Sequence, residues 1–100
     1  MTLDIEVMRA ALNRETAQMD WSELQPFFAR GNIIKVSAAL DLIEVAVRMA
    51  LDDKSALATW LETGEVGKVS DELALDWHAR NPALWSVVVA PWVLVQEKVY

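Results

Sequence analysis

The chain of 100 residues has no cysteine, one histidine, three glycines and three prolines. Without cysteine it forms no disulfide, thiolate nucleophile, iron–sulfur cluster or cysteine-bound zinc site. The single histidine excludes every site that requires two imidazoles. The scarcity of glycine and proline, with 54% hydrophobic residues, excludes collagen-like, low-complexity and disordered chains. We therefore expect one folded domain over residues 1–100.

Positive charge is scarce as well, because nine Lys and Arg residues face 15 Asp and Glu residues, for a formal net charge of −6. Nucleic acids and anionic membranes are bound through clustered cations, and the arginines here are scattered singly. We expect neither partner. The N-terminus lacks the positive segment of a secretory signal, and no apolar run reaches the roughly 20 residues of a membrane helix. The expected location is cytoplasmic.

Capping residues and the helical spacing of apolar side chains predict four helices. The first covers residues 3–19. The second follows Asp20, contains Pro26 and ends at Gly31. The remaining two run from Asp52 or Asp53 to Gly64 and from Ser70 to Asn81.

Two segments favour strands, in addition to the short β-rich run Ile33–Val36. Residues 40–51 fit a helix with Asp41, Glu44 and Arg48 on its polar face, or a strand with alternating apolar residues. The dense β-branched residues favour the strand, turned back antiparallel on residues 33–36. Residues 83–95 are predicted to form one long strand that is apolar on both faces, in which Pro91 indicates a bulge or a backbone side that faces away from a neighbouring strand. The predicted class is α+β, with about four helices packed on one face of a small, mostly antiparallel three-stranded sheet.

Few residues are arranged for chemistry. His78 has no carboxylate at helical spacing to orient it, and the glycines of residues 64–70 are spaced wrongly for a phosphate loop. The acids at 52–53 and 71–76 are explained by helix capping and the helix dipole. We therefore predict no catalytic, cofactor-binding or metal-binding residue, and we lean toward a protein that is not an enzyme.

The five tryptophans are the most unusual feature of the composition. Trp60, Trp77 and Trp85 have apolar periodic neighbours and are predicted to lie in the core. Trp21 and Trp92, together with Val95 of the final strand, are the candidates for an interaction surface, because tryptophan is enriched at binding hot spots.

Several stretches of the chain resemble a known family. They are Trp21-x-Glu-Leu, Leu40-Asp-Leu-Ile-Glu-Val-Ala, Asp52-Asp-Lys, Trp60-Leu and the ending Val88-Val-Ala-Pro-Trp-Val-Leu-Val-Gln-Glu. This pattern, which covers nearly the whole chain, resembles a small bacterial family known only as a domain of unknown function. The resemblance implies a cytoplasmic bacterial protein of α+β type, and it implies no activity, ligand or cofactor.

Two hypotheses on function follow. The favoured one is a non-enzymatic interaction module that forms a homodimer or binds another protein, because a strand that is apolar on both faces needs cover. The alternative is a small-molecule or metal-binding protein, possibly an enzyme, with a pocket near the helix at 71–80 and the residues Asp76, Trp77 and His78.

Overall fold

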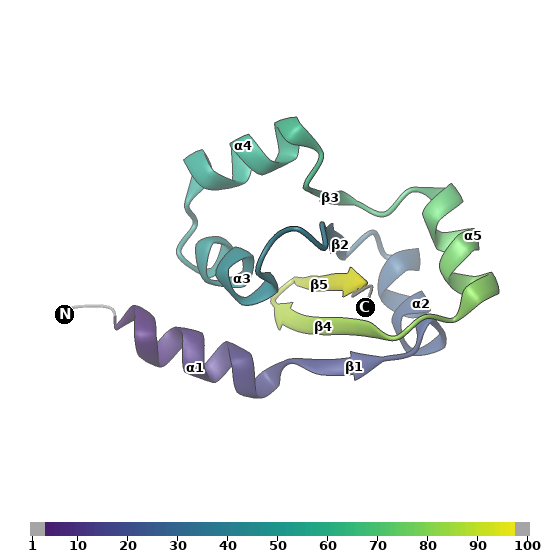
Figure 1. Ribbon diagram of the computed structural model, residues 1–100, viewed down its shortest axis with the longest axis horizontal. Helices are drawn as coiled ribbons and strands as arrows, with labels where there is room; N and C mark the ends of the chain where they lie inside the picture. Colours follow the sequence, from purple (N-terminus) through teal and green to yellow (C-terminus); the bar gives the residue numbers. More distant parts are fainter. Residues whose placement is uncertain (1–3, 98–100) are drawn as a thin grey trace.

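The computed structural model describes residues 4–97 (Figure 1). In this range the chain forms five helices and five strands. In chain order they are α1 (Ile5–Glu15), β1 (Ala17–Met19), α2 (Trp21–Ala29), β2 (Ile33–Val36), α3 (Leu42–Ala50), α4 (Lys54–Thr63), β3 (Val66–Lys68), α5 (Asp71–Arg80), β4 (Leu84–Val89) and β5 (Trp92–Glu97).

The strands form one mixed sheet in the order β1-β4-β5-β2-β3, in which β2 runs parallel to β5 and the other pairs are antiparallel. The α+β class is confirmed. Three of the four strand pairs are antiparallel, as predicted, but the predicted three strands are too few, and residues 4–97 form one helix more than the four expected. The two edge strands β1 and β3 have three residues each, too few for a periodic pattern, and they are strands because they pair with β4 and β2.

Residues 83–95, predicted as one strand, form a hairpin. Val89 pairs directly with Trp92, so Ala90 and Pro91 make the turn, through a cis peptide bond, instead of a bulge. Each strand of the hairpin covers one edge of the other, and β5 lies at the centre of the sheet.

The preference for a strand over residues 40–51 is also wrong, because α3 occupies this segment. The Asp41 carboxylate caps the helix by accepting from the backbone N–H groups of Ile43 and Glu44. Leu42, Val45 and Ala46 are buried against the sheet. Burial of this apolar face and the N-cap together outweigh the β-propensity of the segment, which is a weak preference.

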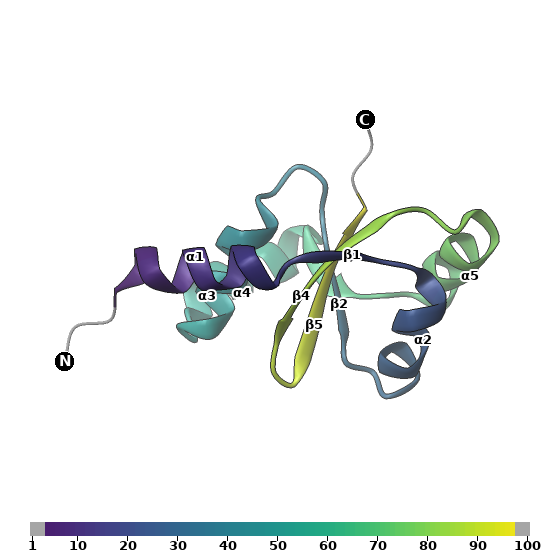
Figure 2. The same cartoon turned by 90° about the horizontal axis from the view of Figure 1, so that it is seen from below.

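Helices cover both faces of the sheet rather than one. Figure 2 shows the sheet nearly edge-on, with α1, α3 and α4 on one side and α2 and α5 on the other. The core accordingly has two parts. Leu94 of β5 packs in the part beneath α1 and α3, and its neighbours Val93 and Val95 pack in the part beneath α2 and α5. A strand that is apolar on both faces is therefore covered within one chain.

Helix boundaries follow the predicted local signals closely. Asp53 and Ser70 cap α4 and α5 through their side chains, and Gly64 ends α4 with a φ of +80°. Two signals differ from the prediction. Asp20 precedes α2 without a capping hydrogen bond to its side chain, and the first helix, predicted over residues 3–19, is shorter. The helix ends at Glu15, because residues 17–19 pair with β4, and residue 3 lies outside the described range. Among the described helices, none is both long and apolar enough to span a membrane.

Candidate functional site

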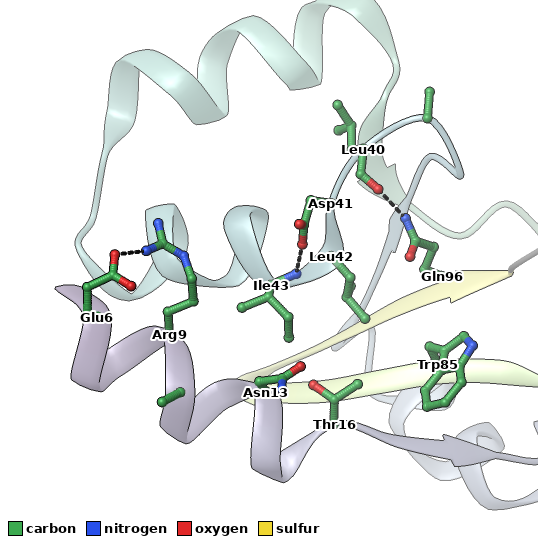
Figure 3. A pocket seen from close by; sticks show the side chains of 12 residues that line it. Glu6, Arg9, Asn13, Thr16, Leu40, Asp41, Leu42, Ile43, Trp85 and Gln96 are labelled. Carbon is green, nitrogen blue, oxygen red and sulfur yellow. Dashed lines mark hydrogen bonds and ion pairs between the residues drawn. The ribbon is translucent and has the colours of Figure 1, made fainter.

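The main cavity of the described chain has a volume of about 780 Å³ and lies where α1 and the start of α3 separate above the sheet (Figure 3). Helix α1 supplies one wall, the loop before α3 and its first turn supply the opposite wall, and β4 and β5 supply the floor. The lining residues are Glu6, Arg9, Ala10, Asn13, Thr16, Ala39, Leu40, Asp41, Leu42, Ile43, Trp85 and Gln96.

Gln96 is the most informative residue of the floor. Only 1% of its surface is exposed, although it is polar and the residues before it on β5, Trp92–Val95, are apolar. Its Nε2 donates hydrogen bonds to the carbonyl oxygens of Ser37, at 2.8 Å, and Leu40, at 2.7 Å. These two acceptors fix the orientation of the amide, since the reversed amide would place oxygen against oxygen. The buried Oε1 then has no hydrogen-bond partner among residues 4–97.

Trp85 lies beside Gln96, because the two residues are paired in the β4–β5 register. Both side chains therefore project from the same face of the sheet, as directly opposite residues do. Trp85 is half-buried and packs against the core beneath α1 and α3. The floor thus combines an aromatic side chain with a buried hydrogen-bond acceptor.

The charged groups at the cavity are already paired. The Arg9 guanidinium donates to Glu44, at 2.8 Å, and to Glu6, and Glu44 also accepts from Arg48, at 3.2 Å. The hydrogen bond from Arg9 lowers the pKa of Glu44, and the same bond raises the pKa of Arg9. Of the lining residues, Glu6 and Asp41 are negative and Arg9 is positive, which leaves one net negative charge. The charge of the lining therefore disfavours anions.

The three residues of the alternative pocket near α5 lie in different surroundings. His78 lines a shallow groove of about 400 Å³ between α2 and α5, together with Trp21, Gln25, Phe28, Asp71, Ala74 and Leu75. Trp77 is buried, with its ring centroid 5.6 Å from that of Trp21. Asp76 lies outside the groove lining and pairs with Arg80, which also binds Glu97 at the end of β5. The hydrogen bond from Arg80 lowers the pKa of Asp76.

The residues named for an interaction surface do not form a common surface on a single chain. Trp21, the first residue of α2, is 3% exposed, and Val95 is fully buried in the same part of the core, between the sheet and the helices α2 and α5. Trp92 is half-buried on the opposite side of the sheet. Within residues 4–97, no group of three or more histidine or acidic side chains is placed to hold a metal ion.

The sequence analysis did not identify Gln96 as a site residue. The available signal is its position, because a glutamine that follows an unbroken apolar run on a central strand is buried if the strand continues through it. Its partners, Ser37 and Leu40, are more than fifty positions away in the sequence, so no local pattern connects them.

Comparisons with known proteins give the same fold but no activity. Residues 7–97 match the family model described as "Protein of unknown function (DUF2288)". The NMR solution structure of PA1075 from Pseudomonas aeruginosa has 50% sequence identity and a TM-score of 0.82, and the match covers 100% of this chain and 93% of that one. A comparison with the curated proteins finds no match.

Proposed function

The chain belongs to the DUF2288 family of proteins of unknown function, and from its geometry we propose that it is a non-enzymatic binding protein for a small organic molecule. The proposed binding site is the cavity bounded by α1, the start of α3 and the β4–β5 hairpin. This site replaces the one expected near residues 71–80, whose three residues do not converge.

One observation carries the proposal, namely the buried Oε1 of Gln96 that has no partner among the described residues. A buried polar atom without a hydrogen bond costs about 1–3 kcal/mol, so an unpaired one calls for a partner such as a ligand or an ordered water. Trp77 Nε1 and Ser86 Oγ are also unpaired among residues 4–97, but neither residue lines this cavity, whereas Gln96 does. Gln96 lines a cavity whose volume lies in the range of ligand sites, and whose lining is about half polar and half apolar.

Binding rather than catalysis suits the other polar groups of the lining. Asp41 accepts hydrogen bonds from the first turn of α3, Thr16 donates to the carbonyl oxygen of Leu12, and Arg9 is held by two carboxylates. These groups are engaged in holding the walls of the cavity, and their bonds orient neither a nucleophile nor a general base toward it.

A fragment screen followed by ¹H–¹⁵N NMR tests the proposal. We expect at least one fragment to shift both the side-chain NH₂ signals of Gln96 and the indole N–H signal of Trp85. Ala10→Phe places a ring in the cavity from an exposed position on α1 and should weaken that binding by more than about tenfold, with little effect on stability. Ala58→Phe, at an exposed position on α4, is the matched control and should bind as the wild type does. A chemically diverse library that shifts neither signal would refute the proposal.

Self-association is a second candidate, supported by Leu75. This side chain is 70% exposed on α5 and borders the mainly apolar groove between α2 and α5. Leu75 and the groove form one contiguous apolar surface, which favours association, whereas a single exposed leucine would need no explanation. Two-fold dimers are the commonest assembly. We propose a second copy of the chain as the partner.

Light scattering from micromolar to millimolar concentrations tests self-association. The expected mass rises toward two chains for the wild type and stays at one chain for Leu75→Asp. Leu61→Asp is the control, because Leu61 is exposed to a similar extent but lies on α4, and this variant should associate normally. A wild-type mass of one chain at every concentration would exclude the dimer.

A further inference from the structure

We propose that the cavity selects a planar aromatic molecule that carries N–H donors and no negative charge, such as an aryl amide, an aryl amidine or an amino-substituted nitrogen heterocycle. The inference rests on the proposed function and adds the chemistry of the ligand. It follows from the three properties of the cavity that the residues determine: the hydrogen-bonding character of its floor, the shape of its floor and the charge of its walls.

The hydrogen-bonding character comes from Gln96. Both N–H groups of its amide are directed at backbone carbonyl oxygens, so the group left without a partner is the acceptor Oε1. This oxygen is fully buried in the free chain, so a ligand reaches it by displacing the side chains that cover it. An acceptor needs a donor opposite it. A ligand that presents an N–H satisfies this oxygen, whereas a ligand that presents a carboxylate or carbonyl oxygen leaves two acceptors facing each other.

The shape of the floor comes from Trp85 and its position relative to Gln96. Trp85 pairs with Gln96 across the β4–β5 register, and the wall next to them carries the apolar side chains Leu42 and Ile43 (Figure 3). A flat ring that packs between Trp85 and this wall brings its substituent to the neighbouring Gln96. Aromatic rings gain from packing on tryptophan in offset or edge-to-face arrangements, so a planar ligand fits the floor best.

The charge of the walls disfavours anions. The positive charge of Arg9 is held between Glu6 and Glu44, and Asp41 adds a further carboxylate at the exposed entry to α3. The carboxylate of Asp41 accepts hydrogen bonds from two backbone N–H groups, and among residues 4–97 it forms no ion pair with a Lys or Arg side chain. A neutral or cationic ligand is therefore favoured over an anionic one of the same shape.

Three probes of nearly identical shape separate these properties. Benzamidine is a cation with N–H donors, and benzamide is a neutral molecule with an NH₂ group as its donor. Benzoate is an anion without a donor. Titration followed by ¹H–¹⁵N NMR should show benzamidine and benzamide shifting the Trp85 indole and Gln96 side-chain signals. Their Kd values should be at least about tenfold below that of benzoate, the difference expected for one buried acceptor left unpaired. Ala10→Phe should abolish these shifts, and Ala58→Phe should preserve them.

Asp41→Asn tests the role of charge separately. Asparagine caps a helix about as well as aspartate, so α3 should keep its N-terminus. The variant should weaken the binding of benzamidine several-fold more than that of benzamide. An equal loss for both probes would contradict the electrostatic part of the inference.

The outcomes distinguish the ligand chemistry from the proposed function. If benzoate binds in the cavity as tightly as benzamide, the assignment of a donor ligand is wrong while the ligand site stands. If all three probes fail but other fragments shift Gln96 and Trp85, the ligand class is likewise wrong. If no fragment of any class shifts these signals, the proposed function itself fails.

Discussion

Gln96→Glu is expected to lower the free energy of unfolding by about 3–5 kcal/mol at pH 7, the range for an uncompensated buried charge. The substitution replaces the amide nitrogen that donates to Ser37 and Leu40 with an oxygen. A carboxylate at this position faces two carbonyl oxygens at a site that is 1% exposed. Chemical denaturation followed by tryptophan fluorescence measures the effect.

The same variant should show a specific pH dependence. Burial raises the pKa of the introduced carboxyl in the folded state above its unfolded value of about 4.3. As the pH rises above the unfolded pKa, the unfolded chain releases its proton first, so the stability of the variant falls with rising pH. Below that value both states are protonated and the loss is smaller, about 1–2 kcal/mol, because the protonated carboxyl donates one of the two original hydrogen bonds.

Gln18→Glu is the matched control. Gln18 of β1 is the register partner of Trp85 of β4, so it lies on the same face of the sheet as Gln96. Unlike Gln96, it is exposed, because β1 is an edge strand. Its substitution should change the free energy of unfolding by less than about 0.5 kcal/mol, both at pH 7 and below the unfolded pKa of the carboxyl. Equal stabilities of Gln96→Glu and Gln18→Glu at pH 7 would show that Gln96 is hydrated, and the basis for a ligand site at its Oε1 would be lost.

Leu94→Ala should destabilise the protein by about 3–5 kcal/mol, the upper part of the range for buried leucines. Leu94 is fully buried on β5, the central strand, and packs in the core beneath α1 and α3. The lost methyl groups leave a cavity between the sheet and two helices, and the paired strands on both sides of β5 restrict its collapse. A domain of this size has a total stability of about 5–15 kcal/mol, so much of it would be lost.

Leu61→Ala provides the comparison for this measurement. Leu61 is 58% exposed on α4, and alanine is at least as favourable in a helix as leucine. We expect a change within about 0.5 kcal/mol. Urea denaturation of the three proteins measures both effects, and a loss below about 1 kcal/mol for Leu94→Ala would contradict the placement of β5 at the centre of the core.

The helix ends were the most predictable part of the structure. Asp53, Ser70 and Gly64 act on backbone groups within three residues of themselves, so their effect is readable from the sequence. The segment 40–51 was predictable only as an alternative, since Asp41, Glu44 and Arg48 favour a helix while its valines and isoleucine favour a strand. The adjoining sheet decided in favour of the helix, because it buries Leu42, Val45 and Ala46.

The final apolar run, residues 83–95, shows a second limit of prediction from the sequence. Its composition correctly indicates strand, but whether it makes one strand or two depends on what pairs with it. Ala90 and Pro91 form the turn between β4 and β5, and β1 and β2 complete the pairing on the two sides. The expectation that a second copy covers the strand followed from reading it as a single element without cover.

The candidate site was beyond prediction for the same reason. Gln96 meets the carbonyl oxygen of Leu40 across 56 positions of sequence, and α1 and α3 form the cavity walls from separate parts of the chain. By itself, the sequence determined the α+β class, the helix caps and the apolar composition of the core, which depend on composition and on neighbours within one helical turn. Only the tertiary structure decided the sheet order, the conformation of residues 40–51 and the buried acceptor of Gln96. These depend on contacts between distant segments, whose free energies exceed the local preferences of the residues involved.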